Sequence, residues 1–399
     1  MTMLAARANH LRTRRAHEHS RVTYVELFFD LVFVFAITQL SHGLLEHMTL
    51  QGALQTGFLM LAVWWLWINV SWMTNWLDPE KAAVRLILMA LMLAGLVLSA
   101  SIPHAFEERA QAFVLAYVFM QVGRTLFMLW ALRAHSPRNF RNFQRIMAWV
   151  LPAAALWTAG VFAGDGWRYG LWGLALAIEY ASPWCGFWTP GLGRSTTADW
   201  DVEGGHMAER CGLFLIIALG ESILVTGATF SNLAWTAETV AAFVVAFVGS
   251  VAMWWIYFNI GAERGSRLIA GSDDPGRMAR MAYTYLHIPI VAGVIVAAVA
   301  DELVLAHPGG HVEAKAAATI LGGPALYLFG NALFKRTSSK HVPLSHLVGL
   351  GLLALLVPVC GFVTPLILSA GTTTVLIMVA IWEWMSLGRR GHATHPVDA

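Results

Sequence analysis

Four polar residues share one face of the first apolar stretch of this sequence: Glu26, Asp30, Thr38 and Ser41. They fall within a sector of about 120° when successive residues are placed 100° apart around a helix. A charged side chain near the centre of a membrane helix costs about 2.5–3.5 kcal/mol on insertion scales, so it requires a partner, a water-filled cavity or a function. The stripe predicts an ion-binding site or polar pathway through Glu26, Asp30 and Thr38. The alternative is a carboxylate that lies at the membrane interface or is paired with a nearby arginine.

Glu221 lies near the middle of the apolar stretch 208–229, where its own helix offers no obvious basic neighbour. We interpret it as an ion or proton site in the same pathway. The alternative is a buried, protonated acid that only forms hydrogen bonds. Glu209, at the start of this stretch, is assigned to the pathway as well.

Other polar residues also fall within apolar stretches. His287 precedes Ile288 and Pro289, where proline frees a backbone carbonyl, and a single histidine there is more typical of a satisfied core residue than of a ligand. Glu179 and Glu383 are predicted to lie at the membrane interface. The remaining polar residues of this group are amides: Asn69, Asn259 and Asn331.

No catalytic or metal-binding pattern is found in the sequence. His307 and His311 flank a Pro-Gly-Gly turn near Asp301 and Glu302, and a turn cannot place two imidazoles on one helical face. There is also no phosphate-binding glycine loop and no nucleophile motif. We therefore predict no metal, no cofactor and no enzymatic activity.

The composition excludes a water-soluble protein. Hydrophobic residues make up 57% of the 399 residues, and charged residues make up 13%, whereas soluble domains average roughly 25% charged residues. A net charge of +2 argues against a nucleic-acid partner. The three cysteines are far apart, so neither a disulfide framework nor a zinc module is indicated. The predicted partner is the lipid bilayer.

Twelve stretches are long and apolar enough to span a bilayer as helices, which takes about 20 residues each. They are 25–44, 55–77, 83–102, 112–132, 146–163, 167–186, 208–229, 236–260, 280–300, 315–334, 344–366 and 371–387. The fold class is therefore an all-α polytopic membrane protein.

The loop charges predict the orientation. Cytoplasmic loops carry the excess of Lys and Arg, and most of the 26 basic residues fall in alternate loops if the N-terminus is inside. Arg109, Arg168 and Lys315 are the only basic residues in the loops on the outer side of the membrane or at their margins. Arg124 falls within a span. Both termini are predicted to be cytoplasmic, in a bacterial inner membrane.

The second half of the chain repeats features of the first in the same order. Trp64–Asn69 (WWLWIN) recurs as Trp254–Asn259 (WWIYFN), and Glu179 is matched by Glu383. Each half has six spans, an even number, which predicts a parallel repeat. The predicted segments are a basic tail 1–24, a first six-helix repeat 25–186, a cytoplasmic linker 187–207, a second repeat 208–387 and a tail 388–399.

Arg124 cannot be deprotonated and needs a partner. The repeat places Leu213 at the position equivalent to Asp30 and Asn331 at the position equivalent to Arg124, so the acid and the base are both missing from the second half. This predicts an ion pair between Asp30 and Arg124.

Two segments carry a family resemblance: Tyr24–Ile37 (YVELFFDLVFVFAI) and Glu209–Leu224 (ERCGLFLIIALGESIL). With His287-Ile288-Pro289, they resemble the bacterial low temperature requirement protein A family. The family name implies a role in growth in the cold and no established chemistry.

A fainter resemblance concerns the first helix. Phe28-x-Asp30 and the following residues are similar to the Phe-Ser-Asp motif of lysosomal-type potassium channels, although Phe29 replaces the serine and Leu31 the glycine. This resemblance implies that the first helix of each repeat lines a pore.

These patterns together predict an ion channel or permease with a polar pathway between the first helices of its repeats. The transported species would be a small ion or a proton. The alternative is a non-transporting membrane protein for cold adaptation or signalling. The sequence indicates no oligomeric state.

Overall fold

A computed structural model of the chain describes residues 9–12, 21–196, 199–200, 202–259, 275–339 and 342–391. The described residues form helices and turns, with two isolated β-bridges. Several basic residues that set the predicted orientation lie outside the described residues: Arg7, Arg14, Arg15, Arg264, Arg267 and Lys340.

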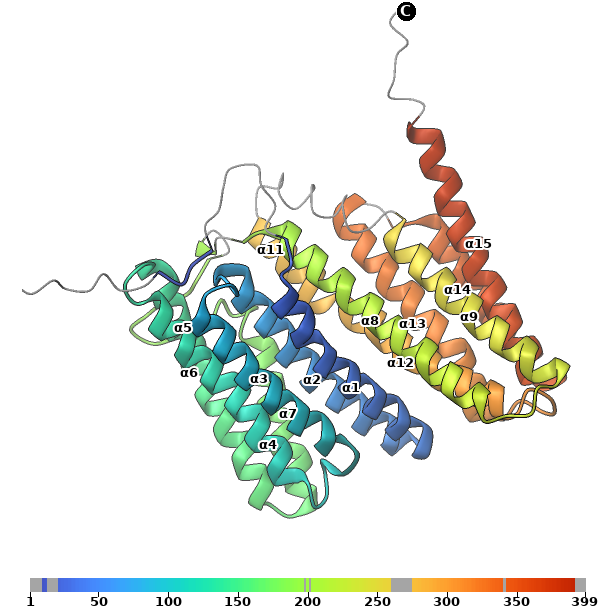
Figure 1. Cartoon of the computed structure of the whole chain (residues 1–399), viewed down its shortest axis with the longest axis horizontal. Coiled ribbons are helices and arrows are strands. Elements are labelled where there is room, and N and C mark those ends of the chain that lie inside the picture. Colours follow the sequence, from blue (N-terminus) through green and yellow to red (C-terminus); the bar gives the residue numbers. More distant parts are fainter. Residues whose placement is uncertain are drawn as a thin grey trace, which may run out of the picture. The chain divides into compact units, whose positions relative to one another are not determined.

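The chain divides into two compact units, and the first comprises Met1–Leu40, Gln55–Arg210 and Ser272–Ala279. Within it, α6 packs against α7, α5 and α4, and α3 packs against α4 (Figure 1). A π-helical turn, Phe119–Gly123, joins α4 to α5. The helices that begin in the first half of the chain are α1 (Tyr24–Glu46), α2 (Leu50–Trp76), α3 (Ala82–Ser101), α4 (Ala110–Val118), α5 (Arg124–Leu132), α6 (Pro137–Phe162) and α7 (Asp165–Ala181).

The second unit comprises Ser41–Leu54, Cys211–Gly271 and Arg280–Ala399. Its helix α8 begins in the first unit, because Gly204–Arg210 are grouped there. A π-helical turn, Arg280–Tyr285, precedes α12. The helices of the second half are α8 (Gly204–Ser231), α9 (Ala237–Phe258), α11 (Pro275–Ala279), α12 (His287–Ala306), α13 (Ala314–Ser339), α14 (Leu344–Leu356) and α15 (Pro365–Gly391).

The all-helical membrane fold is confirmed. Each of the twelve predicted stretches coincides with helix, and eleven helices in the described part of the chain are long and apolar enough to cross a membrane. The exception is α7, whose 17 residues span about 26 Å against a bilayer core of about 30 Å. It ends at Ala181 instead of continuing to 186, because Pro183 cannot donate the next helical hydrogen bond.

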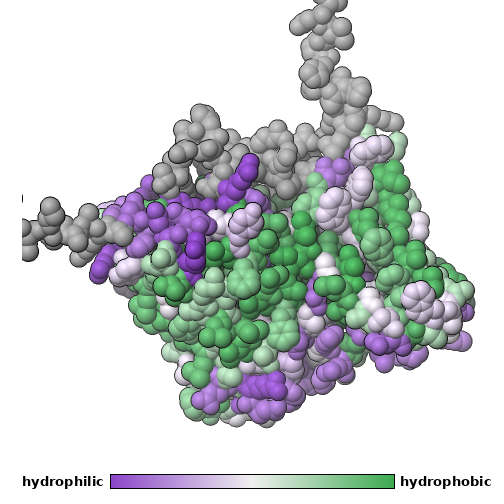
Figure 2. Space-filling view, viewed as in Figure 1, coloured by the Kyte–Doolittle hydropathy of each residue, from purple (hydrophilic) through white to green (hydrophobic). Residues whose placement is uncertain are grey.

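The surface fits a lipid environment. On the face shown in Figure 2, hydrophobic side chains cover the middle of the helices and hydrophilic side chains gather near their ends. Large apolar side chains remain exposed on α3 and α4, including Leu86 (70%), Leu93 (66%) and Leu115 (61%). Soluble monomers rarely expose such continuous apolar surface, so the bilayer is the partner of these faces.

The segment after α7 is held by local hydrogen bonds. Asp199 Oδ2 accepts hydrogen bonds from the Thr196 backbone N–H (2.7 Å) and hydroxyl (2.9 Å), and Arg138 lies 3.4 Å from its other oxygen. These donors favour the ionised carboxylate, so the pKa of Asp199 is lowered.

Helices α12 and α13 approach with their backbones nearly in contact. A Cβ atom added to Gly293 would lie 2.6 Å from the backbone nitrogen of Tyr327, and one added to Gly323 would lie 2.7 Å from the backbone nitrogen of Ala297. Small residues allow this close approach between membrane helices.

We expect Gly323→Ala to lower the free energy of unfolding by about 1–3 kcal/mol, because the methyl group meets backbone atoms that can only move with the whole helix. The neighbouring substitution Gly322→Ala is the control, since a Cβ there meets nothing within 4 Å. Thermal denaturation in detergent measures both variants. Equal stability of the two variants would contradict the tight helix contact.

Candidate functional site

A buried network of charged side chains joins the start of α1 to the start of α8, within the first unit. Glu26 and Asp30 are one turn apart on α1, and His206 and Arg210 are one turn apart on α8. The side chains of all four are 0% exposed. Glu26 contacts His206 and Asp30 contacts Arg210, so both contacts join residues 180 positions apart. Contacts in this order require the two segments to run in the same direction.

Asp30 and Arg210 form a two-pronged ion pair. Arg210 Nη2 lies 2.8 Å from Asp30 Oδ1, and Nη1 donates to Oδ2 at 3.0 Å. The Trp67 indole N–H also donates to Oδ1, at 2.7 Å. Such fork-shaped pairs combine charge with fixed geometry. The pair thus fixes the separation of α1 and the first turns of α8.

Arg210 uses most of its remaining donors nearby. Nη1 donates to the Glu26 backbone carbonyl at 2.8 Å, and Nη2 donates to the Ser71 hydroxyl at 3.2 Å. Its guanidinium carbon lies 5.5 Å from the centre of the Trp67 ring, within the range of a cation–π contact. Only its Nε–H finds no partner among the described residues.

Glu26 is the second centre of the network. Its Oε1 accepts from His206 Nε2 at 2.8 Å, and its Oε2 accepts from Arg12 at 2.9 Å and from the Thr23 backbone N–H at 2.9 Å. Asn75 Nδ2 lies 3.3 Å from His206 Nδ1. Nδ1 faces this donor, and Nε2 lies closer to the Glu26 carboxylate (2.8 Å) than to Arg12 Nη2 (3.2 Å), so these partners favour the neutral tautomer with hydrogen on Nε2. The two carboxylates are then balanced by the two guanidinium groups.

Arg12 comes from the stretch predicted to be a cytoplasmic tail. Its backbone N–H donates to the Trp76 carbonyl at 2.9 Å, and its Nε donates to the Thr74 carbonyl at 2.7 Å. The adjacent Leu11 forms an antiparallel bridge with Leu77. Residues 9–12 are therefore attached to the end of α2 and supply one charge of the network, the half-buried Arg12.

The structure places the predicted pathway residues in different surroundings. Glu26 and Asp30 are brought together in the network. Thr38, half-buried in the first unit, donates to the Val34 carbonyl at 3.1 Å. Glu209 is exposed and accepts from the Val22 backbone N–H at 3.1 Å. Glu221 is half-buried on α8 in the second unit.

The predicted pair of Asp30 with Arg124 is corrected by the structure. Asp30 binds Arg210, and Arg124 instead donates to Gln121 Oε1 at 3.2 Å. The physical reason is the spacing on the two helices. Glu26 contacts His206, and one turn further along each helix Asp30 meets Arg210. The loop charges predict instead that Arg210 is one of the basic residues on the cytoplasmic side.

The other polar residues are held by local contacts. His287 Nδ1 lies 2.8 Å from the Ala282 carbonyl, and its Nε2 lies 2.8 Å from the Tyr257 hydroxyl, so it is a satisfied core residue. Asn69 and Asn331 donate to carbonyls one turn earlier on their helices. Asn259 follows the end of α9 and is half-buried.

Glu179 and Glu383, which are predicted to lie at the membrane interface, have side chains that are enclosed by neighbouring helices. Both are buried, with 4% and 3% exposure, because donors from neighbouring helices surround each carboxylate. Lys335 Nζ lies 2.6 Å from Glu383 and also donates to the Ile256 carbonyl at 2.7 Å.

Comparison with known proteins identifies the family. A family model described as bacterial low temperature requirement A protein (LtrA) matches residues 21–381. The chain belongs to this family. An uncharacterized protein of Rhizobium meliloti (strain 1021) is 39% identical over 385 residues, which cover 96% of this chain and 94% of that protein. No solved structure matches the chain.

The family match confirms the resemblance that the sequence motifs predicted. Both motifs lie within the matched residues, and the buried network joins them, since Glu26 and Asp30 belong to the first and Arg210 to the second. As a member of the LtrA family, the chain is a multi-pass membrane protein.

Sequence reasoning missed three members of the network in this LtrA family chain: Arg12, His206 and Arg210. One signal for two of them is present in the sequence. Glu26 and Asp30 are four residues apart, and so are His206 and Arg210, which places each pair on one face of its helix. Two complementary pairs with equal spacing indicate facing helices.

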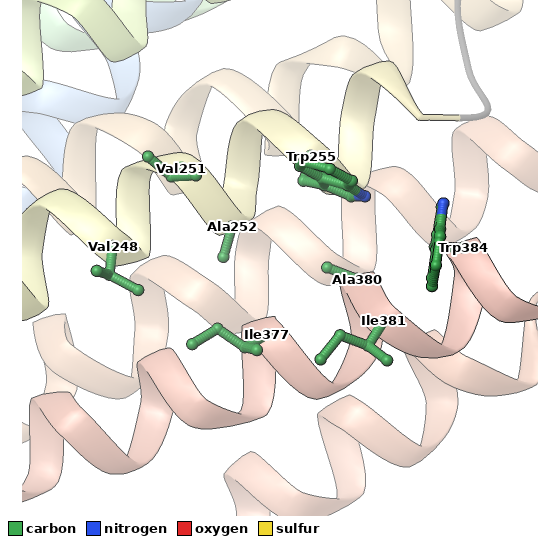
Figure 3. A pocket seen from close by; sticks show the side chains of 8 residues that line it. All are labelled: Val248, Val251, Ala252, Trp255, Ile377, Ala380, Ile381 and Trp384. Atoms are coloured by element: carbon green, nitrogen blue, oxygen red, sulfur yellow. The ribbon is translucent and has the colours of Figure 1, made fainter.

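Two further features of the LtrA chain offer groups that a ligand could contact. His104 Nδ1 lies 3.3 Å from Glu107 and 3.5 Å from Glu108 on an exposed turn, where a metal ion would find three ligand atoms. In the second unit, α9 and α15 border a groove of about 240 Å³ that offers hydrophobic side chains (Figure 3). The groove is lined by Val248, Val251, Ala252, Trp255, Ile377, Ala380, Ile381 and Trp384.

Proposed function

We propose that this LtrA family member conducts a small ion or a proton across the bacterial inner membrane, and that the network around Glu26 and Asp30 is its cytoplasmic gate. The observation that carries the proposal is the complete burial of two carboxylates, a histidine and Arg210 in helices that are predominantly apolar. Apolar residues of similar volume often stabilise a fold as well as or better than a buried ion pair. Ionisable residues within membrane helices are by default candidates for a functional site.

The contacts support a closed gate. Glu26 and Asp30 offer the oxygen atoms that a passing cation would bind, and these oxygens are occupied by Arg12, His206 and Arg210. A cation would compete with these partners only after the pairs separate. We propose that opening separates the start of α1 from the start of α8.

Two observations support the proposed parallel repeat, and a third supports the orientation. The start of α1 and the start of α8 run in the same direction, as equivalent helices of a parallel repeat do. In addition, each half has a buried glutamate in its sixth predicted span near a basic residue in its fourth: Glu179 of α7 near Arg124 of α5, and Glu383 of α15 near Lys335 of α13. The loop charges favour cytoplasmic termini.

Flux measurements in proteoliposomes test the proposal. We expect measurable ion or proton flux from the wild-type protein, and at least about tenfold more from Glu26→Gln, the equivalent of roughly 1.4 kcal/mol in the closed–open equilibrium. Gln cannot balance the charges of Arg12 and Arg210, so the gate is weakened. Glu221→Gln should reduce the flux if Glu221 lines the pathway.

Glu46→Gln is the matched control, because Glu46 lies on the same helix α1 but is exposed. It should behave as the wild type does. Absence of flux above that of empty liposomes, for all tested ions and for protons, would overturn the transport proposal.

A second candidate function is a non-transporting membrane protein. It is favoured by the burial of Phe29 (0%), Phe33 (1%) and Leu40 (1%) along α1, since a dry helix face suits a static interface. On this proposal, Glu26→Gln lowers stability in detergent and produces no flux.

A further inference from the structure

We infer that Glu179 is a proton-binding site, separate from the network of α1 and α8. Glu179 lies near the end of α7 and faces the rod formed by α4, the π-helical turn and α5. Its neighbours Tyr117 (0%), Gln121 (2%) and Arg124 (3%) are all buried. The site lies entirely within the first unit.

The carboxylate of Glu179 is held by neutral donors. Tyr117 donates its hydroxyl hydrogen to Oε2 at 2.6 Å, and Gln121 Nε2 donates to Oε1 at 3.0 Å. Arg124 reaches the carboxylate only through Gln121, to whose Oε1 it donates at 3.2 Å. A buried carboxylate without a directly bound cation is costly to keep ionised, and a proton removes that cost.

Groups from every adjoining helix define this environment. Helix α4 supplies Tyr117 and α5 supplies Arg124, whose Nε–H finds no partner among the described residues. Helix α6 supplies Trp157, whose ring centre lies 4.5 Å from that of Tyr117. On α7 itself, the adjacent Tyr180 donates its hydroxyl hydrogen to the Leu61 carbonyl of α2 at 2.9 Å. Among the described residues, Arg124 is therefore the charged group that hydrogen bonds link to the site.

The partners of Glu179 can serve both of its protonation states. A tyrosine hydroxyl is both donor and acceptor, so Tyr117 can donate to the carboxylate and, after rotation about its C–O bond, accept from the carboxylic acid. Gln121 can keep its hydrogen bonds to Glu179 and Arg124 when Glu179 gains or loses the proton. Glu179 thus takes one proton from solvent water and returns it without repacking of the helices.

The equivalent glutamate of the second half lacks this property. Glu383 contacts Lys335 at 2.6 Å, and His346 Nδ1 lies 3.3 Å from its other oxygen. An ammonium group has three donors and no acceptor, so a protonated Glu383 would face Lys335 with no acceptor there. The second half holds a fixed ion pair where the first half holds a site for exchange.

The backbone provides an independent observation. Gln121 lies within the π-helical turn Phe119–Gly123, and π-bulges in α-helices are frequent at functional sites. Within this turn, the backbone carbonyl of Gln121 accepts a hydrogen bond from the Thr125 hydroxyl at 2.7 Å. This wide turn thus carries the side chain that links Arg124 to Glu179.

Infrared difference spectroscopy of the purified protein, recorded between high and low pH, tests the inference. We expect a carbonyl-stretch band of a protonated, buried carboxylic acid to appear on acidification. Glu179→Gln should lose this band, whereas the control Glu46→Gln should keep it. An unchanged difference spectrum in Glu179→Gln would overturn the site.

Tyr117→Phe provides a second measurement if Glu179→Gln folds poorly. It keeps the carboxyl group and removes the hydroxyl that bonds to it, so we expect the same band at a shifted frequency. A band that Tyr117→Phe leaves at the wild-type frequency would also overturn the site. The experiment measures protonation without flux, so its outcome is independent of the proposed transport function.

Discussion

Asp30→Asn is expected to lower the free energy of unfolding by about 3–5 kcal/mol, because it removes the carboxylate that pairs directly with the buried Arg210 guanidinium. Asn can accept one hydrogen bond from Arg210 but cannot compensate its charge. Both side chains are 0% exposed, so water cannot take over the missing contact. Chemical or thermal denaturation of the purified protein in detergent measures the loss.

A double-mutant cycle isolates the pair. Arg210→Gln alone should cost a similar amount, and Asp30→Asn with Arg210→Gln should cost clearly less than the sum of the two single changes. Arg124→Asn is the comparison, since Arg124 bonds to Gln121; its effect should add to that of Asp30→Asn. Additive losses for Asp30 and Arg210 would contradict the ion pair.

Lys335→Met is also expected to cost about 3–5 kcal/mol, because it leaves the Glu383 carboxylate buried in the second unit without its ammonium partner. The side chain of Lys335 is 5% exposed and that of Glu383 is 4% exposed. The variant also removes the hydrogen bond to the Ile256 carbonyl. Thermal denaturation followed by circular dichroism measures the change.

The charge-free double variant, Lys335→Met with Glu383→Met, distinguishes the loss of the pair from the loss of packing. Replacing a buried ion pair by apolar side chains is often neutral or stabilising, so we expect the double variant to recover most of the stability. A double variant less stable than Lys335→Met would contradict a mainly electrostatic loss.

The helices could be predicted from the sequence because each depends on a local property. Twenty apolar residues in succession form a helix in a bilayer whatever their neighbours are, since every backbone group must be hydrogen-bonded within the segment. The exception, α7, is shorter than predicted because Pro183 ends it, although the hydrophobic residues continue.

The partners of the charged residues depend on contacts between distant parts of the chain. Glu26 and Asp30 could be singled out by their cost in an apolar stretch, but the predicted partner of Asp30 is Arg124, an arginine near the middle of a span. Arg210 had been counted among the loop residues that set the orientation. Glu26 and Asp30 are four residues apart, as are His206 and Arg210. These equal spacings predict the observed contacts better than the position of each residue along its span does.

The attachment of residues 9–12 to the end of α2 has a practical consequence for protein production. Removing the first 20 residues would take Arg12 away and leave Glu26 with one cation fewer. A bulky fusion partner close to Leu11 would compete with its bridge to Leu77. Affinity tags are therefore better fused after residue 391, beyond the end of α15.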